Sequence, residues 1–359
     1  MNKGIAVNST RCLDFWSGQA VDRPLVSFWI GTFSIPDLYP LSMSCLPDGQ
    51  LTASEFDFSM FEEDYLNLYE SNLDSPSDVP WSAFPLMTIP WLEAILGCPI
   101  IKKGNNIWAE QLDGGLQGFL SQSIDLDANP WLERLLAFQR WLAALSVGRF
   151  PTSASLMRGP SDLLSAICTP TRMCLEFIDH PNLVMQALDR LTDFWIEIAQ
   201  RQLAIIPQYK EGYCFGQIFL WGKNKGAWFQ DDAVALISPK HYRQFLLPCE
   251  KRIAAALPAS GIHLHPGSLF VVDDLVEIPD LDVIEINYEP YGVTLEKMLP
   301  FLIKVKKSKR LVLWGDFTTE DLVFLNRNLS PDNLCLQMNV VDVKAAKEMM
   351  DRVSETWKS

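Results

Sequence analysis

The chain has 359 residues, of which 48% are hydrophobic and 21% are charged. This composition can supply a large core, and it excludes a disordered chain, a collagen-like chain and a disulfide-rich miniprotein. The net charge of −14, from 30 basic and 44 acidic residues, would repel a phosphate backbone and argues against nucleic-acid binding.

Cysteine usage and hydropathy bear on localisation. The eight cysteines form no CxxC pair, which is typical of reduced thiols in a core. No uncharged run of about 20 apolar residues marks a transmembrane helix, and charged residues interrupt residues 1–24, where a signal peptide would be apolar. We therefore expect a cytoplasmic protein that does not associate with membranes.

In chain order, the first 115 residues are rich in prolines and aromatic residues. The first predicted strand of the chain, over residues 25–30, lies in this part. From residue 149, short β-type runs alternate with helical patterns. The predicted strands of this part cover residues 152–157, 213–220, 261–265, 282–288, 310–314 and 334–340, and an eighth strand is expected within 83–110. Cap and proline signals predict helices over about 181–206 and 239–257, with a kink at Pro248, and further helices after Thr318 and Asp342.

Alternating strands and helices predict parallel strands joined by crossover helices. Seven or eight such units fit an α/β fold of the (β/α)8, TIM-like barrel type. Residues 1–115 would form an N-terminal extension and the first barrel elements, and residues 116–359 the remainder of a single barrel domain. No GxGxxG follows the first strand and no GxxxxGK[ST] motif occurs, which argues against a Rossmann domain and a P-loop NTPase.

Side-chain alternation predicts a polar interior. Ile262 and Leu264 share the face that suits helix packing, so His263 and His265 point into the barrel. The same alternation turns further polar residues inward, namely Glu285, Asn287, Glu289, Cys335, Gln337 and Asn339. Each needs a partner, because an unpaired buried polar group costs about 1–3 kcal/mol. Such a cluster near strand ends is typical of an active site.

The histidines allow two interpretations. His263 is either a hydrogen-bonded core residue or a ligand, whereas His265, directly before Pro266 at the end of its strand, favours a functional role. Imidazole, carboxylate and thiolate together suit zinc, and a zinc-bound thiol becomes a strong nucleophile. The candidate metal ligands are His263, His265, Glu285 and Cys335, although Cys335 also fits a plain core position.

Other strand ends carry candidate binding residues. Arg158, between a strand and a helix, would either clamp a substrate carboxylate or pair with an acidic residue of the barrel. Large indole rings at strand ends can line a pocket. The candidate substrate-binding residues are Trp29, Trp221, Asn287, Trp314, Gln337 and Asn339.

Several of these stretches resemble the uroporphyrinogen decarboxylase superfamily, which includes corrinoid-dependent methyltransferases. The resemblance rests on Gly159-Pro160, on residues 237–242 with Pro248 following, on residues 261–267 and on residues 311–316. It extends over residues 149–353 in matching order and spacing. It implies a (β/α)8 barrel with an N-terminal extension, a pocket at the carboxyl ends of the strands, and a possible homodimer.

The resemblance does not fix the subfamily. Uroporphyrinogen decarboxylases carry an arginine-rich loop near the N-terminus, but the corresponding residues 28–39 hold no arginine, so a polycarboxylate would bind poorly. Corrinoid methyltransferases hold zinc with a His-x-Cys pair and a later cysteine. Here the first motif is His263-Leu264-His265, and Cys335 lies earlier in the last strand than the family cysteine, so the resemblance implies a variant site built from His265, Glu285 and Cys335.

Three functions are therefore open. In the first, the chain is a methyltransferase that moves a methyl group between a small substrate and a thiol or a corrinoid protein. His265 would then be a zinc ligand or acid/base, Glu285 a ligand or orienting group, and Arg158 a substrate clamp. In the second, it decarboxylates uroporphyrinogen or a related polycarboxylate in porphyrin biosynthesis without a cofactor. In the third, it is a non-catalytic barrel that binds a small ligand or a corrinoid protein.

Overall fold

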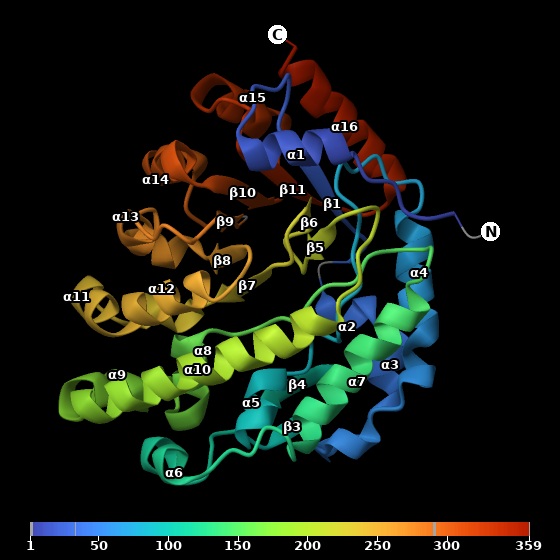
Figure 1. Cartoon of the computed structure of the whole chain (residues 1–359). Helices are drawn as coiled ribbons and strands as arrows, with labels where there is room; N and C mark the ends of the chain where they lie inside the picture. The colour runs from blue at the N-terminus through green and yellow to red at the C-terminus, as the bar shows by residue number, and fades with distance from the viewer. Residues whose placement is uncertain (1–2, 33, 290–291, 359) are drawn as a thin grey trace.

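The computed structural model describes residues 3–32, 34–289 and 292–358 as a mixed α/β protein (Figure 1). Its strands are β1 (Leu25–Ile30), β2 (Gly49–Leu51), β3 (Ile100–Lys103), β4 (Asn106–Ala109), β5 (Tyr213–Phe215), β6 (Leu220–Gly222), β7 (Ala227–Gln230), β8 (Ser260–Leu264), β9 (Val283–Tyr288), β10 (Arg310–Gly315) and β11 (Leu334–Val340).

The first helices are α1 (Ser9–Ser17), α2 (Ile35–Leu38), α3 (Pro40–Cys45), α4 (Glu62–Asn72), α5 (Trp91–Leu96), α6 (Gly115–Ser121), α7 (Pro130–Leu145) and α8 (Pro160–Cys168). They are followed by α9 (Pro170–Asp179), α10 (Pro181–Ile205), α11 (Pro239–His241), α12 (Leu247–Ala255), α13 (Val272–Leu275), α14 (Leu295–Ser308), α15 (Thr319–Asn328) and α16 (Val343–Thr356). Short 3-10 helices include η3 (Asp232–Leu236) and η5 (Pro266–Val271). None of the helices in the described ranges is long and apolar enough to cross a membrane.

Six strands form one sheet in the order β1-β11-β10-β9-β8-β7, and every neighbouring pair is parallel. The helices that follow β8 to β11 lie on its outer side (Figure 1). The predicted strands at 25–30, 261–265, 282–288, 310–314 and 334–340 are all in this sheet, to within a residue. Apolar runs between strong turn signals located them, since parallel strands are buried on both faces.

The predicted strand at 213–220 is wrong. Residues 213–222 form the antiparallel hairpin β5–β6, outside the main sheet, and the strand of the sheet in this region is β7, which was not predicted. The chain reverses between Gly216 and Phe219, where the Phe219 backbone has a φ of +37°, a conformation rare outside glycine. No proline or Asn-Gly signal marks this turn, so the apolar run resembles one strand.

The hairpin tip packs against the sheet. The Phe219 ring stacks on Trp29 of β1 with 5.4 Å between the ring centroids. The amide of Gln337 in β11 donates to the carbonyl of Gln217 at 2.8 Å. The tip therefore lies on the side of the sheet that carries the inward-pointing side chains.

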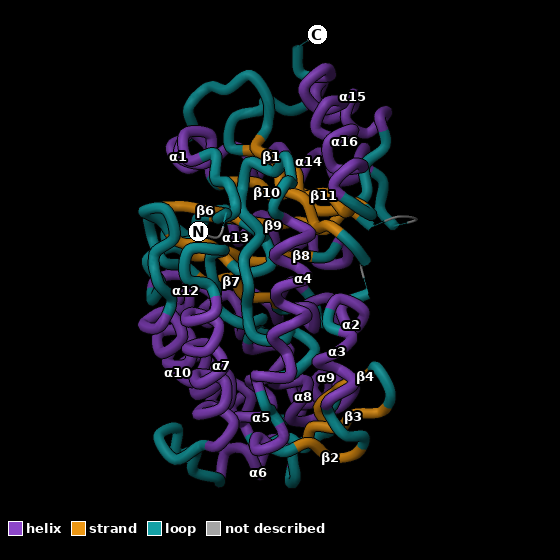
Figure 2. Tube along the Cα trace, turned by 90° about the vertical axis from the view of Figure 1, so that its right-hand side faces the viewer, coloured by secondary structure: helices purple, strands orange, loops and turns teal. Residues whose placement is uncertain are grey.

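Two further expected strands are reduced to single parallel bridges. Ala83 pairs with Thr152, and Arg158 pairs with Gln230 of β7. Pro80, Pro85 and Pro151 lack the N–H that a longer ladder would need. The later part of the 83–110 window forms β3 and β4. β3 pairs antiparallel with both β2 and β4 in a separate three-stranded sheet, far from the main sheet in Figure 2.

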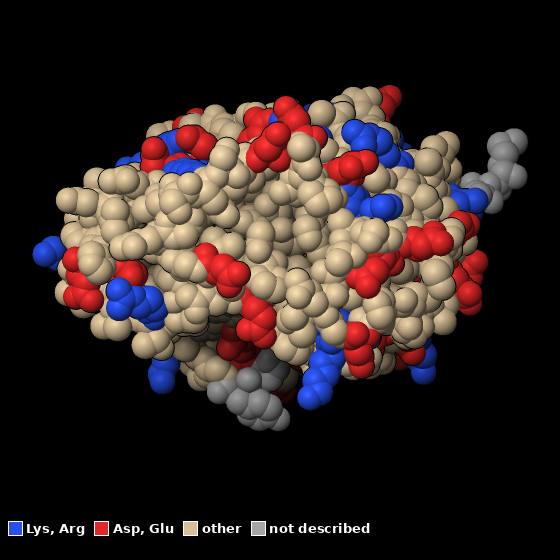
Figure 3. Space-filling model, turned by 90° about the horizontal axis from the view of Figure 1, so that it is seen from below, with Lys and Arg blue, Asp and Glu red and all other residues tan. Residues whose placement is uncertain are grey.

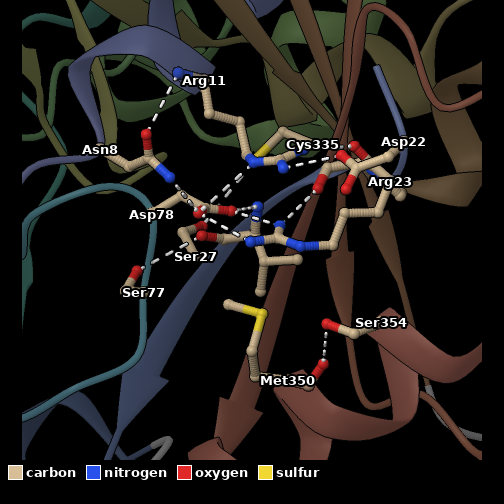
Figure 4. Close-up of polar contacts among 12 residues, drawn as sticks. Asn8, Arg11, Asp22, Arg23, Ser27, Ser77, Asp78, Cys335, Met350 and Ser354 are labelled. Atoms are coloured by element: carbon tan, nitrogen blue, oxygen red, sulfur yellow. Dashed lines mark hydrogen bonds and ion pairs between the residues drawn. The ribbon is translucent and has the colours of Figure 1, made fainter.

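A buried ion pair joins the segment before Ala83 to β1 (Figure 4). The carboxylate of Asp78, with a side chain 4% exposed, accepts two bonds from Arg23, at 2.6 and 2.9 Å. It also accepts from the Val26 backbone at 3.0 Å and from the Asn8 amide at 3.1 Å. The Asp78 backbone N–H in turn donates to the carbonyl of Val26. These bonds hold the segment beside β1.

The predicted helix starts are confirmed. α10 begins at Pro181, α15 is capped by Thr318 in a reciprocal capping box with Asp321, and α16 is capped by Asp342. The helix predicted over 239–257 is irregular before Pro248, where a π-helical turn over Tyr242–Leu246 separates α11 from α12. Pro248 has no N–H for the preceding turn, which accounts for the irregular hydrogen bonding there.

Candidate functional site

Two histidines meet at the carboxyl end of β8. His263 is the inward residue next to the last position of the strand, and His265 is the first residue after it. Their Nε2 atoms are 3.1 Å apart, and the two rings are nearly perpendicular, at 88°. Strand alternation placed both on the same side, and the structure brings them into contact.

Each ring is held from behind by a carboxylate of the next strand. Nδ1 of His263 contacts the carboxylate of Glu285, which is fully buried in β9. Nδ1 of His265 lies 2.6 Å from Oε1 of Glu289, just beyond the end of β9. A carboxylate accepts the Nδ1–H proton, so each Nε2 is left with its lone pair. The two lone pairs then face one another, which a shared proton or a cation would stabilise.

The charge state of His263 follows from its neighbours. Burial is the largest single effect and opposes the charged form of the ring, but the combined effect of the charge and hydrogen bond of Glu285 and of more distant carboxylates raises the pKa of His263 above its ordinary value. Asp232 and Asp162 act in the same direction from farther away. The pocket around this ring therefore favours positive charge.

Asp232 completes a candidate metal cluster. Its Oδ1 is 3.8 Å from Nε2 of His265, and its Oδ2 accepts a bond from the Gln230 amide at 2.8 Å. One ligand atom from each of Asp232, His263 and His265 lies within 4.8 Å of the others, the one such group within the described ranges. Asp232 was not predicted as a site residue, because β7 was not predicted as a strand. The signal was the acidic pair Asp231-Asp232, one residue after the apolar run Ala227-Trp228-Phe229.

The structure does not assemble the four metal ligands expected from the sequence. Glu285 orients His263, and it is not part of the group whose ligand atoms converge. Cys335 points to the same side, but it pairs in register with Val312, which pairs on its other side with Glu285. β10 and β9 thus both lie between the thiol and the histidines of β8. Cys335 is fully buried beside Ser27, and burial raises the pKa of its thiol.

Two of the predicted tryptophans lie near the histidines. The indoles of Trp29 and Trp314 are 5.5 Å apart, and Trp314 is 6.5 Å from the ring of His263. The Trp314 indole donates to Asn339 at 2.9 Å, and the Asn339 amide donates to Asp316 at 2.9 Å. Both indoles are more than nine-tenths buried, so they form a rigid apolar wall on this side of the cluster.

The remaining predicted residues are spread more widely. Asn287 is in register with Trp314 and is half-buried, and Gln337 is engaged with the hairpin tip. Trp221 is not near the cluster. Its carbonyl accepts from Trp16, which precedes β1, and its indole donates to Tyr209. Trp221 therefore packs at the amino-terminal edge of the sheet, opposite to the histidines.

A cleft of about 570 Å³ opens beside Asp232. Its polar lining comprises Glu110, Gln111, Arg158, Asp162, Ser165, Thr169, Gln230 and Asp232. Arg158, in its wall, is paired at 3.1 Å with the buried Glu93, which belongs to α5 and not to a strand of the sheet, and the Arg158 side chain stays 46% exposed. Burial and the neighbouring Asp232 raise the pKa of Asp162 to about 7. On the face drawn in Figure 3, acidic and basic residues are interspersed, and the described residues form no continuous basic patch.

Comparisons with known proteins identify the fold. No family model and no curated protein matches the chain. Among solved structures, the chain is similar to a methyltransferase from Methanosarcina mazei, with a TM-score of 0.66 and 15% sequence identity. The match covers 98% of this chain and 99% of the other. The likeness shows that the two chains share a fold over nearly their whole length.

Proposed function

We propose that the chain is a methyltransferase that moves a methyl group between a small substrate and a thiol or a corrinoid carried by a partner protein. The observation that carries the proposal is the pair of facing Nε2 atoms of His263 and His265, each with its Nδ1 fixed by a carboxylate. The fold shared with a methyltransferase supports it, as does the family resemblance of residues 149–353.

The donor set fits zinc. Two imidazoles and one carboxylate are a common zinc ligand set, and a fourth position stays open for substrate. His263, His265 and Asp232 would hold the ion in this chain. When bound, zinc lowers the pKa of a substrate thiol and so supplies a thiolate at neutral pH.

The chain's own residues prepare this site. Glu285 and Glu289 select the tautomer of each histidine and fix the orientation of its ring. Trp29 and Trp314 keep water from the buried side of His263. A dry, pre-oriented site strengthens every electrostatic contact that a reacting group makes there.

The proposal includes a closed (β/α)8 barrel. The six-stranded sheet supplies six of the eight barrel strands, and the segments around Ala83 and Thr152–Arg158 would supply the other two. Three contacts support this closure, since the first segment bonds β1 through Asp78, the two segments bridge each other, and Arg158 bridges β7. The histidines would then lie at the carboxyl mouth, where barrels of this kind place their active sites.

Decarboxylation of a polycarboxylate has less support. Arg158 is the one basic residue among the described residues that line the cleft, and its charge is already engaged by Glu93. Three carboxylates, those of Glu110, Asp162 and Asp232, line the same cleft. A polyanion would meet net negative charge there.

Elemental analysis of protein purified without chelator tests the proposal. We expect about one zinc per chain in the wild type, and little in His265→Ala and Asp232→Asn. The control is His241→Ala, because His241 is a half-buried histidine that stacks on Phe177, away from the cluster. Zinc-loaded wild type should also demethylate methylcobalamin in the presence of a thiol, followed by absorbance. Absence of zinc from the wild type, or equal zinc in His265→Ala, would refute the metal centre.

A further inference from the structure

The cleft beside Asp232 is built by segments from distant parts of the chain. Glu110 and Gln111 follow β4, Arg158 and Asp162 flank the start of α8, and Gln230 and Asp232 mark the end of β7. The cleft shares Asp232 with the candidate metal cluster. A molecule in the cleft would therefore reach the histidines at one end.

The fixed charges of this cleft do not balance. The positive charge of Arg158 is satisfied from behind by Glu93, whose side chain is 1% exposed. Arg158 also interacts electrostatically with Asp162 and Asp232, but its charge is shared with Glu93, which does not line the cleft, so the described lining sets three carboxylates, those of Glu110, Asp162 and Asp232, against this one guanidinium. Two of these carboxylates are partly buried, where solvent screening is reduced.

The hydrogen bonds of the carboxylates leave them available to a ligand. Asp162 uses one oxygen to accept from the Ala233 backbone at 2.8 Å. Glu110 accepts from the Trp108 indole at 2.8 Å through one oxygen. Both donors are neutral groups, so neither hydrogen bond cancels the negative charge of the carboxylate that accepts it, and a cation in the cleft would favour the ionised form of Asp162.

We infer that this cleft binds the positively charged group of an organic ammonium compound, held by Asp162 and Glu110 with its other end toward Asp232 and the histidines. The inference rests on the proposed function, because it takes the cleft as the substrate cleft of that site. It specifies the small substrate as a cation, a charge class that the lining favours over a neutral or anionic molecule of the same shape.

A set of three isosteric probes tests the charge preference. Choline, 3,3-dimethyl-1-butanol and 3,3-dimethylbutanoate share a bulky trimethyl head and differ in charge. We expect choline to bind the full-length protein, as purified, at least about tenfold more tightly than the neutral alcohol, a difference of about 1.4 kcal/mol. The carboxylate should bind most weakly. Binding is followed by ligand-observed NMR titration.

Two variants locate the effect. Asp162→Asn keeps an oxygen to accept from Ala233 but removes the charge, and Glu110→Gln does the same at an exposed position where folding is not at risk. Each should reduce choline affinity severalfold and leave the alcohol unchanged. The control is Glu348→Gln, which removes an exposed charge from α16 and should change nothing.

His265→Ala separates this inference from the metal centre. It leaves Asp162 and Glu110 in place, so the preference for choline should persist in it whether or not the wild type holds zinc. Equal affinity for choline and the alcohol, or tighter binding of the carboxylate, would overturn the inference. So would a preference that survives both Asp162→Asn and Glu110→Gln.

Discussion

The buried ion pair of Asp78 and Arg23 gives the sharpest prediction about stability. In Asp78→Asn the shape of the side chain is kept, but the carboxylate that accepts from Arg23, Val26 and Asn8 is lost. An amide has one acceptor oxygen, so its NH2 group must face at least one of these donors. The Arg23 guanidinium, whose side chain is 15% exposed, would remain without its partner.

The expected loss is large. Breaking a buried ion pair by removing one partner costs about 3–5 kcal/mol, because the other charge stays buried and uncompensated. We expect the free energy of unfolding of Asp78→Asn to fall by this amount. Because the bonds to Asp78 hold the 77–84 segment beside β1, the variant should also lose hydrogen-exchange protection there first.

Urea unfolding followed by tryptophan fluorescence measures the effect, since the chain contains 12 tryptophans. Asp74→Asn is the matched control: it is the same substitution four residues earlier, where the carboxylate pairs with Lys3 and both side chains are more than two-thirds exposed. That exposed pair should contribute nothing measurable. A loss below about 1 kcal/mol in Asp78→Asn, or an equal loss in both variants, would refute the reasoning.

Three other predictions concern pH, metal binding and a helix cap. Glu250 is fully buried against Tyr242, and burial raises its pKa to about 7, so the folded state binds more protons than the unfolded state does. The free energy of unfolding should therefore fall by up to about 1.4 kcal/mol per pH unit as pH rises from about 4.5 to 7. Chemical unfolding should show a flatter pH profile in Glu250→Gln, and an unchanged profile would contradict the assignment. Glu289→Gln should weaken zinc binding about 10–100-fold by releasing Nδ1 of His265. Competition with a chelating dye measures the zinc affinity, and equal affinity in the variant and the wild type would contradict this prediction. Thr318→Ala should lower the free energy of unfolding by about 1 kcal/mol through loss of the α15 cap, measured in urea; no change would mean that the cap bond adds nothing.

Local patterns were sufficient for most of the regular sheet. Alternation in 261–265 and 283–289 correctly placed His263 and Glu285 on one side, because the two-residue period of a strand is a local property. The same reasoning could not tell that Cys335 lies two strands from Glu285. Distance across a sheet depends on strand order and register, which no single strand encodes.

The other failures also have physical causes. The 213–220 run is apolar throughout, and its turn rests on the unusual backbone of Phe219, which only tertiary packing against Trp29 stabilises. Asp232 follows a four-residue strand, too short for a visible alternation. The pairing of Arg158 with Glu93 joins residues 65 positions apart, so the sequence could pose both roles for Arg158 but not choose between them.

The hairpin tip has a consequence for the order of turnover. Phe219 and Gln217 fill the concave side of the sheet from its amino-terminal edge, and Trp221 with Trp16 covers that edge. In the closed barrel proposed above, access to the histidines would then be left to the opposite, carboxyl-terminal opening. If a methyl-carrying protein docks on that opening, it blocks the exit while it is bound. The small molecule would then have to enter before the carrier arrives and depart after it leaves, which makes the exchange of partners itself a step that can limit the rate.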